Sequence, residues 1–196
     1  MAIDLTTADR VKRRWRTTDT TLDALIGEII DEVSQTFERF MQRHTLSAAR
    51  VEIVELPRFK KVVTFRGAPV SSVTEIKVHN TGDFTSVDAL DSTLYTVDLA
   101  AGYARLRILT TWRPAYVEVN YTGGMAADTA TFIASYPEIS AAADRECIER
   151  LRKSRNPTGT PVLRAKGGKP EQRPDNDWGL MASTRLVLTA YRKGIV

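Results

Sequence analysis

Tyr95-Thr-Val-Asp98 opens a segment that continues through Leu99-Ala-Ala-Gly102 to Tyr103-Ala-Arg-Leu-Arg-Ile-Leu109. The two outer runs are rich in aromatic and β-branched residues, which favour strands. Gly102 can adopt the positive φ that a short connection between antiparallel strands often needs. A third run of the same kind, Tyr116-Val-Glu-Val-Asn-Tyr121, follows. The pattern predicts an antiparallel hairpin with a third strand beside it.

Further strand-like runs precede this hairpin. They cover Val51 to Leu56, Lys61 to Phe65 and Val70 to Val78, while residues 80–93 contain the turn-forming Asn80-Thr-Gly-Asp83 and read as a polar loop. Five or six short strands separated by turns are typical of a small antiparallel sheet or sandwich. We therefore expect a β region over residues 51–122.

Helical patterns flank the β region on both sides. Thr6 or Thr7 can cap a short helix over residues 8–16, and Thr17-Thr-Asp-Thr-Thr21 can cap a long one over 21–41. The long helix repeats apolar residues at the i, i+3, i+4, i+7 spacing of a single stripe, for which the following sheet is the nearest partner. Pro137 suits the first turn of a helix over 137–155, and residues 126–136 before it are small and polar. The apolar stripe of the long helix comprises Leu22, Leu25, Ile26, Ile29, Ile30, Val33, Phe37, Phe40 and Met41.

The C-terminal part of the chain has a different composition. Residues 156–180 are rich in proline and glycine and contain few apolar residues, which predicts an extended arm. A short apolar helix over 184–192 follows, and an apolar terminus beyond an arm favours a docking peptide over a piece of the chain's own core. The predicted fold class is thus α+β. A helical bundle and a small antiparallel sheet or sandwich form an adaptor domain over 1–155, and 156–196 form the arm.

Charge is unevenly distributed along the chain, although the net charge is only +4. Residues 9–16 hold five cations and one acid, whereas residues 19–38 hold six acids and no cation. Basic blocks of this kind can bind nucleic acid, can bind the acidic block of a neighbouring copy, or can simply be solvated. No run of 18 apolar residues is present, so we expect a soluble protein without a membrane partner.

The sequence offers little for catalysis or metal binding. His44 and His79 lie in different predicted elements, and neither has a second ligand at metal-binding spacing. Cys147 is the single cysteine and falls on the apolar side of a helix, an unfavourable place for a reactive thiolate. No serine stands in a G-x-S-x-G motif. We therefore predict a protein that is not an enzyme and has no catalytic residue, cofactor or metal.

Several segments, taken in order and spacing, carry a family resemblance along nearly the whole chain. The chain resembles the head–tail connector adaptor proteins of tailed bacteriophages and related gene-transfer particles, also called head completion proteins. The segments are Ile3-Asp-Leu-Thr-Thr-Ala-Asp-Arg-Val-Lys12, Asp19-Thr-Thr-Leu-Asp-Ala-Leu-Ile-Gly-Glu-Ile-Ile-Asp31, Phe37-Glu-Arg-Phe40, Pro69-Val-Ser-Ser-Val-Thr-Glu-Ile76, the hairpin, Val117-Glu-Val-Asn-Tyr-Thr-Gly-Gly124 and Leu188-Thr-Ala-Tyr-Arg192.

The resemblance implies a structural protein in the neck of a virion that is assembled in the host cytoplasm. Such proteins form a ring of about a dozen copies beneath the portal protein after DNA packaging. They continue the channel for the packaged DNA and offer a platform to the next neck or tail protein, a stopper or tail-completion protein. Their helical part builds the ring, and their C-terminal segment commonly docks on the portal.

Two sets of residues become candidate contacts. The terminal helix supplies the portal-docking candidates Leu186, Val187, Leu188, Tyr191 and Arg192. The first helix supplies the cations Arg10, Lys12, Arg13, Arg14 and Arg16, which are expected to contact the acidic helix of a neighbouring copy or the DNA in the channel. The alternative is a non-specific nucleic-acid-binding protein that uses this basic helix and the cations of the C-terminal arm.

Overall fold

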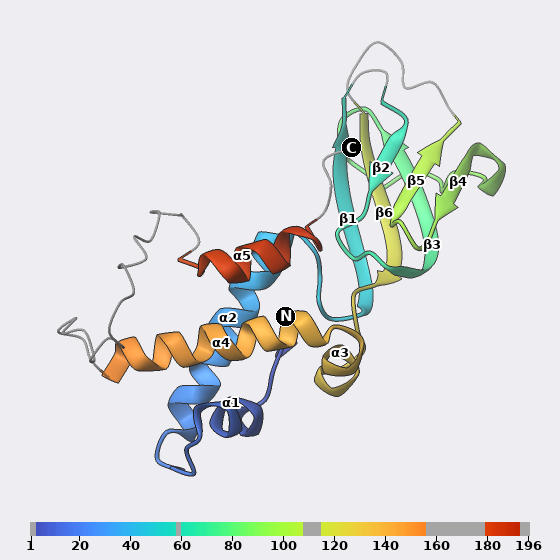
Figure 1. Ribbon diagram of the computed structural model, residues 1–196. Helices are drawn as coiled ribbons and strands as arrows, with labels where there is room; N and C mark the ends of the chain where they lie inside the picture. Colours follow the sequence, from blue (N-terminus) through green and yellow to red (C-terminus); the bar gives the residue numbers. More distant parts are fainter. Residues whose placement is uncertain (1–2, 58–59, 108–114, 156–178, 193–196) are drawn as a thin grey trace. The chain divides into compact units, whose positions relative to one another are not determined.

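The computed structural model describes residues 3–57, 60–107, 115–155 and 179–192 (Figure 1). The chain divides into two compact units. The helical unit combines Met1–Gln42 with Asp128–Val196, and the sheet unit is Arg43–Ala127. Helices and antiparallel strands are thus segregated along the chain, which confirms the predicted α+β class.

The sheet unit contains two antiparallel sheets of three strands each. The strand order is β1-β6-β3 in one sheet and β2-β5-β4 in the other. A short 3-10 helix, η1 (Ser92–Leu94), leads into β4. The strands are β1 (Ala48–Leu56), β2 (Val62–Thr64), β3 (Val70–His79), β4 (Tyr95–Asp98), β5 (Tyr103–Leu106) and β6 (Ala115–Gly123).

The predicted hairpin is confirmed, but its predicted third neighbour is wrong. Strands β4 and β5 pair from Tyr95 opposite Leu106 to Asp98 opposite Tyr103, and Gly102 has φ +70° in the connection. Strand β6 lies in the other sheet, between β1 and β3. Strand length explains the difference. Strand β6 has nine residues, and β1 and β3, with nine and ten residues, can pair along its whole length. Residues 108–109 of the predicted strand lie outside the described residues.

The two sheets share one apolar core. Strand β6 alternates between buried and half-buried positions along its whole length, as expected for a strand with one face against a core. Its Val117 and Val119 are fully buried beside residues of both sheets, including Leu56 and Leu106. The core therefore joins the hairpin sheet to the longer sheet.

A polar contact is built into this core at Tyr121. Its phenol donates to Glu52 Oε1 at 2.7 Å and accepts from the Gly67 N–H at 2.9 Å. His44 Nε2 lies 3.3 Å from Glu52 Oε1. Burial alone would raise the pKa of the Glu52 carboxyl, but hydrogen bonds from His44, Tyr121 and the Arg66 N–H outweigh burial and lower that pKa.

The helical unit is assembled around α4, which contacts each of the other four helices. The buried face of α4 includes Ala142, Ala143 and Cys147. The apolar stripe of α2 packs on this helix, with α1 and α5 alongside. The prediction that the sheet would cover the stripe is therefore wrong, since another long helix with a buried face of small side chains covers it. The helices are α1 (Ala8–Trp15), α2 (Asp23–Met41), α3 (Thr129–Ser135), α4 (Pro137–Arg155) and α5 (Ala182–Thr189).

The helix starts differ in part from the predictions. Thr7 caps α1 by accepting from the Arg10 N–H, as expected. Helix α2 begins at Asp23 without a side-chain cap, because Asp19 accepts from both the N–H and the hydroxyl of Thr21 and forms a separate turn. Among the described helices, none combines the length and apolar character needed to cross a membrane.

Helix α3 lies in the segment of small and polar residues, 126–136, for which the sequence predicted no helix. Asp128 caps it by accepting from the Thr131 N–H at 2.7 Å. Phe132 is fully buried, and its ring lies 5.2 Å from that of Tyr136. An N-cap acid followed by one buried aromatic residue is a weak signal, which explains why the sequence did not predict this helix.

Replacement of Gly67 by alanine is expected to destabilise the sheet unit. A Cβ at this position would lie 2.6 Å from the Tyr121 ring, which is buried and cannot move away freely. We expect a loss of about 2 kcal/mol, typical of overpacking in a core. Thermal unfolding followed by circular dichroism measures it. Gly27→Ala is the matched control, because a Cβ there meets nothing within 4 Å and should stabilise α2 by up to about 1 kcal/mol.

The Glu52 carboxylate is expected to make stability depend on pH. Its pKa is lower in the folded chain than the ordinary value of 4.5, so the stabilisation is present above pH 4.5 and is lost as the pH falls through the folded-state value. Urea unfolding at pH 7 should show Glu52→Gln to be less stable than the wild type, and the gap should narrow at pH 3. Glu55→Gln, at an exposed position of the same strand, should show no such change. A gap that stays constant with pH would contradict the assignment.

Candidate assembly interface

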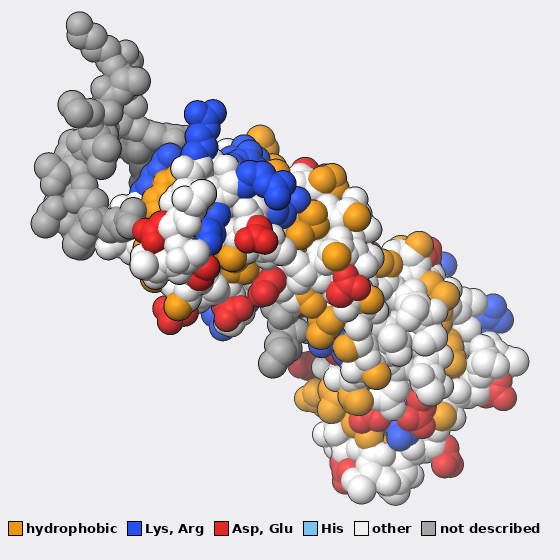
Figure 2. Space-filling view, turned by 90° about the horizontal axis from the view of Figure 1, so that it is seen from below, with side chains coloured by type: hydrophobic (Ala, Val, Ile, Leu, Met, Phe, Trp, Pro, Cys, Tyr) orange, Lys and Arg blue, Asp and Glu red, His pale blue; other side chains and the backbone are white. Residues whose placement is uncertain are grey.

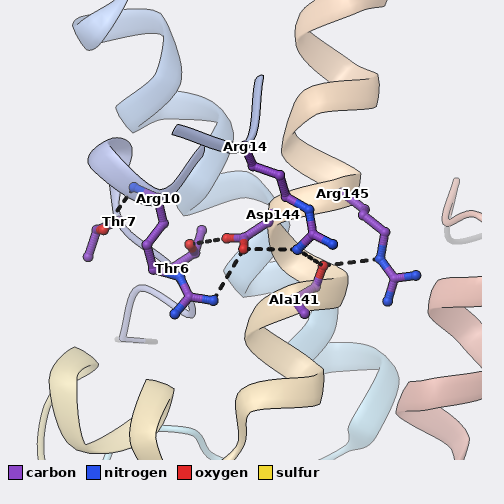
Figure 3. A network of polar contacts seen from close by, with 7 residues as sticks. All are labelled: Thr6, Thr7, Arg10, Arg14, Ala141, Asp144 and Arg145. Carbon is purple, nitrogen blue, oxygen red and sulfur yellow. Dashed lines mark hydrogen bonds and ion pairs between the residues drawn. The ribbon is translucent and has the colours of Figure 1, made fainter. Parts of the chain in front are cut away.

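One buried carboxylate holds the first helix in place. Asp144 on α4 is only 3% exposed and accepts hydrogen bonds from the Thr6 hydroxyl, from Arg10 Nη2 at 3.2 Å and from Arg14 Nη1 at 3.3 Å (Figure 3). Arg14 also donates to the Ala141 carbonyl at 3.3 Å. A buried charge is tolerated only when it is paired and hydrogen-bonded, and Asp144 meets that condition through residues of the N-terminal segment.

The structure separates the five cations predicted to contact a neighbour or DNA. Arg10 and Arg14 bind Asp144, and Lys12 Nζ lies 2.6 Å from Asp23 Oδ1 at the start of α2. Within the described part of the chain, Arg13 and Arg16 have no ion-pair partner, and both side chains are exposed. Cationic side chains gather over the side of the helical unit on which α1 lies (Figure 2). A contact of this set with another molecule stays a prediction.

A second buried carboxylate of α4 holds α5. Glu146 is 1% exposed, and its Oε2 accepts from the Met181 N–H at 3.2 Å and from the Thr184 hydroxyl at 3.3 Å. Helix α5 has no side-chain cap of its own. Glu146 therefore satisfies a backbone donor at the start of α5 and places a negative charge where the helix dipole favours one.

Helix α5 spans residues 182–189 rather than the predicted 184–192, and it packs on α4 and α2. Leu188 is fully buried there, so this candidate docking residue already contributes to the chain's own core. Tyr191 donates to Glu138, and the Arg192 guanidinium lies 5.5 Å from the centre of the Phe40 ring. Val187 is half-buried. Leu186 faces outward, with 78% of its surface exposed, and Arg192 is also exposed.

A groove of about 660 Å³ lies between α2 and α4. Its α2 side carries the carboxylates Glu28 and Glu32, and Arg150 Nη1 lies 2.5 Å from Glu32 Oε1 across it. Sequence reasoning identified the acidic face of α2 but not the groove, because α2 and α4 are far apart in the sequence. The residues that line the groove are Leu25, Glu28, Ile29, Glu32, Thr36, Glu146, Arg150, Lys153, Ser154 and Gly179.

The two histidines and the cysteine are the residues that the sequence offers for metal binding or catalysis. His44 contacts Glu52, a carboxylate neighbour that sequence spacing did not reveal, and His79 Nδ1 lies 2.9 Å from the Thr81 hydroxyl. Cys147 is buried, and burial together with the nearby Asp144 charge raises the pKa of its thiol to about 12. No group of three or more potential metal ligands occurs among the residues that the structure describes.

Comparisons with known proteins find similarity in structure only. No family model matches the sequence, and no curated protein is significantly similar to it. The chain is similar to one in the neck of an empty gene transfer agent (GTA) particle, computed with C6 symmetry, at 16% identity and a TM-score of 0.55. That match covers 96% of this chain and 89% of the other.

Two further matches come from related particles. One is a chain in the virion of a native GTA particle, at 13% identity and a TM-score of 0.51, covering 87% of this chain and 79% of that chain. The other is a chain in the neck of a native GTA particle, computed with C12 symmetry, at 14% identity and a TM-score of 0.53, covering 90% and 86%. The fold implied by the sequence resemblance is confirmed, since this chain shares the fold of proteins from GTA necks.

Removal of the Asp144 carboxylate is expected to loosen α1. Asp144→Ala deprives two arginines and one hydroxyl of their shared acceptor, which should cost about 2 kcal/mol of unfolding free energy. Amide hydrogen exchange should show the loss concentrated in residues 6–15. Asp9→Asn, at an exposed acid in the first turn of α1, is the control and should change stability by less than about 0.5 kcal/mol. Unchanged exchange in α1 would contradict the role of Asp144.

Proposed function

We propose that this protein is a structural component of the neck of a phage-like virion and has no enzymatic activity. The observation that carries the proposal is the fold match to a chain in a GTA neck, which extends over 96% of this chain. A fold alone does not define a function. Here the ordered sequence segments that resemble head–tail connector adaptors point to the same place in a particle.

In this proposal, about a dozen copies form a closed ring beneath the portal after DNA packaging. The ring continues the DNA channel and presents a platform for the next neck or tail protein. Related necks computed with C6 and C12 symmetry support an arrangement of repeated copies. Opposite charges concentrated in different segments of one chain also suit contacts between identical subunits.

The C-terminal helix is proposed to contribute to portal binding. It is held on its own unit through Glu146 and the buried Leu188, so its inner face is occupied. Its outer face presents Leu186, which is 78% exposed. A large exposed leucine on a fixed helix is a suitable anchor for a pocket on a partner, because little conformational entropy is lost when it binds.

A non-specific nucleic-acid-binding protein is the second candidate, favoured by the exposed arginines of α1. Two observations favour the adaptor over it. Arg10, Lys12 and Arg14 contact acids of their own chain, which reduces the charge available to phosphates. The acidic α2 face would also repel a nucleic acid that lay along the helical unit.

The proposal is tested by mixing purified protein with the portal protein of its own particle. Mass photometry should detect a complex that contains one ring of the adaptor per portal. Duplex DNA binding, measured at rising salt, should be weak beside portal binding. Strong salt-sensitive binding to duplex DNA without any portal complex would support the second candidate instead.

Replacement of Leu186 by aspartate is expected to weaken portal binding at least tenfold without unfolding the protein. The side chain is mostly exposed, so its loss costs the free protein little, whereas a charge cannot enter an apolar pocket. Surface plasmon resonance on immobilised portal measures the affinity.

Leu188→Ala is the matched contrast to Leu186→Asp on the same helix. Leu188 is fully buried, so its truncation should lower stability by about 2–5 kcal/mol. If Leu186→Asp binds the portal as tightly as the wild type does, portal binding does not use the outer face of α5.

A further inference from the structure

The two buried carboxylates of α4 mark opposite sides of that helix. Asp144 and Glu146 are two residues apart, which places their side chains about 200° apart around an α-helix. Asp144 is covered by the N-terminal segment and α1. Glu146 is covered by the start of α5 and also lines the groove between α2 and α4. Helix α1 and the groove therefore lie on opposite sides of α4.

We propose that the groove of one copy receives α1 of the next copy, with Arg13 and Arg16 directed at the carboxylates of α2. This inference rests on the proposed function, since it specifies the contact that repeats around the ring. The occupant is thus a second copy of this chain.

The acidic partner is the exposed face of α2. Glu28, Asp31 and Glu32 share one side of the helix because they are spaced at i, i+3 and i+4. Among the residues that the structure describes, Glu28 has no ion-pair partner, and the Glu32 side chain remains 66% exposed although it contacts Arg150. Asp31 lies beside Asp4 of the N-terminal segment, and burial together with this neighbouring carboxylate raises the pKa of Asp4. Glu28 and Glu32 line the groove itself, together with the cations Arg150 and Lys153.

The basic partner is the outward side of α1. Arg10, Arg14 and Lys12 fix the helix to α4 and α2. Arg13 in this fixed helix and Arg16, its C-cap, are both exposed. Preorganised charges of this kind lose little entropy on binding and set which partner and orientation are accepted.

The arrangement excludes one other use of the same charges. Arg13 and Arg16 cannot fill the groove of their own copy, because α4 lies between them and the groove. Since the two surfaces differ and lie on opposite sides, each copy can bind one neighbour at each surface. Such a head-to-tail contact repeats and closes into a ring when the rotation between copies allows it.

Disulfide trapping tests the contact. A chain with both Arg16→Cys and Glu28→Cys should give a ladder of dimers, trimers and larger species on mild oxidation, because every copy carries both halves. Each single variant should form few disulfide-linked dimers, and a mixture of the two single variants should give disulfide-linked dimers but no larger species. The native Cys147 is buried and should not compete.

Two results of the trapping would overturn the inference. The first is a double variant that forms an internal disulfide instead of a ladder, since that would place both surfaces on one side of α4. The second is a set of single variants that form dimers as readily as the mixture does, since that would indicate a symmetric contact or random collision.

Charge reversal supplies the second test. In the trapping background, added Arg13→Glu should reduce the ladder at least tenfold, and so should added Asp31→Arg. Both changes in one chain should restore the ladder, because opposite charges again face each other between copies. Arg105→Glu, at an exposed position of the sheet unit, is the control and should leave the ladder unchanged. High salt should weaken trapping because the contact is exposed at its rim.

The outcomes separate this inference from the proposed function. Normal portal binding without a ladder overturns the inference alone, and a ladder without portal binding counts against the proposed function alone. If Arg13→Glu leaves the ladder intact but abolishes binding to duplex DNA, the arginines contact DNA and the inference is wrong.

Discussion

Asp144 is a carboxylate that the helical unit can bury only while the N-terminal segment stays in place. Three donors from Thr6, Arg10 and Arg14 reach it, and loss of any one would leave charge or a hydrogen-bonding group unsatisfied in the interior. Glu146 imposes the same requirement on α5 from the opposite side of α4. The outer helices are therefore fixed by polar contacts as well as by apolar packing, and their exposed side chains are held in defined positions.

In the sheet unit, polar contacts of one core residue, Tyr121, likewise hold separate segments together. Tyr121 fills the core with its ring and brings its hydroxyl to Glu52 and to the Gly67 N–H. Gly67 lies so close to that ring that no side chain fits there. A hydrogen-bonded polar pair in an apolar core favours one register of β1 and β6, because a shift by one residue would turn Glu52 to the other face.

The sequence predicted individual helices and strands better than it predicted which of them pack or pair together. The apolar stripe of α2 and the β4–β5 hairpin depend on local periodicity and turn chemistry, and both are present in the structure. The neighbours of β6 and the cover of α2 depend on matching lengths and shapes over long separations, and these predictions were wrong. In the candidate interface, five adjacent cations looked equivalent. Only Asp144, about 130 residues away, separates Arg10 and Arg14 from Arg13 and Arg16.

The helical unit is built from both ends of the chain, with the whole sheet unit inserted between them. During synthesis, α1 and α2 emerge long before α4, so neither buried acid nor the groove exists until late. The sheet unit, by contrast, is continuous and can fold as soon as it emerges. A prematurely terminated polypeptide would lack α4, so α1 would lose the carboxylate that fixes it and the groove would be missing. Because both proposed contact surfaces need α4 for their shape, incomplete chains would join an assembly of finished ones poorly.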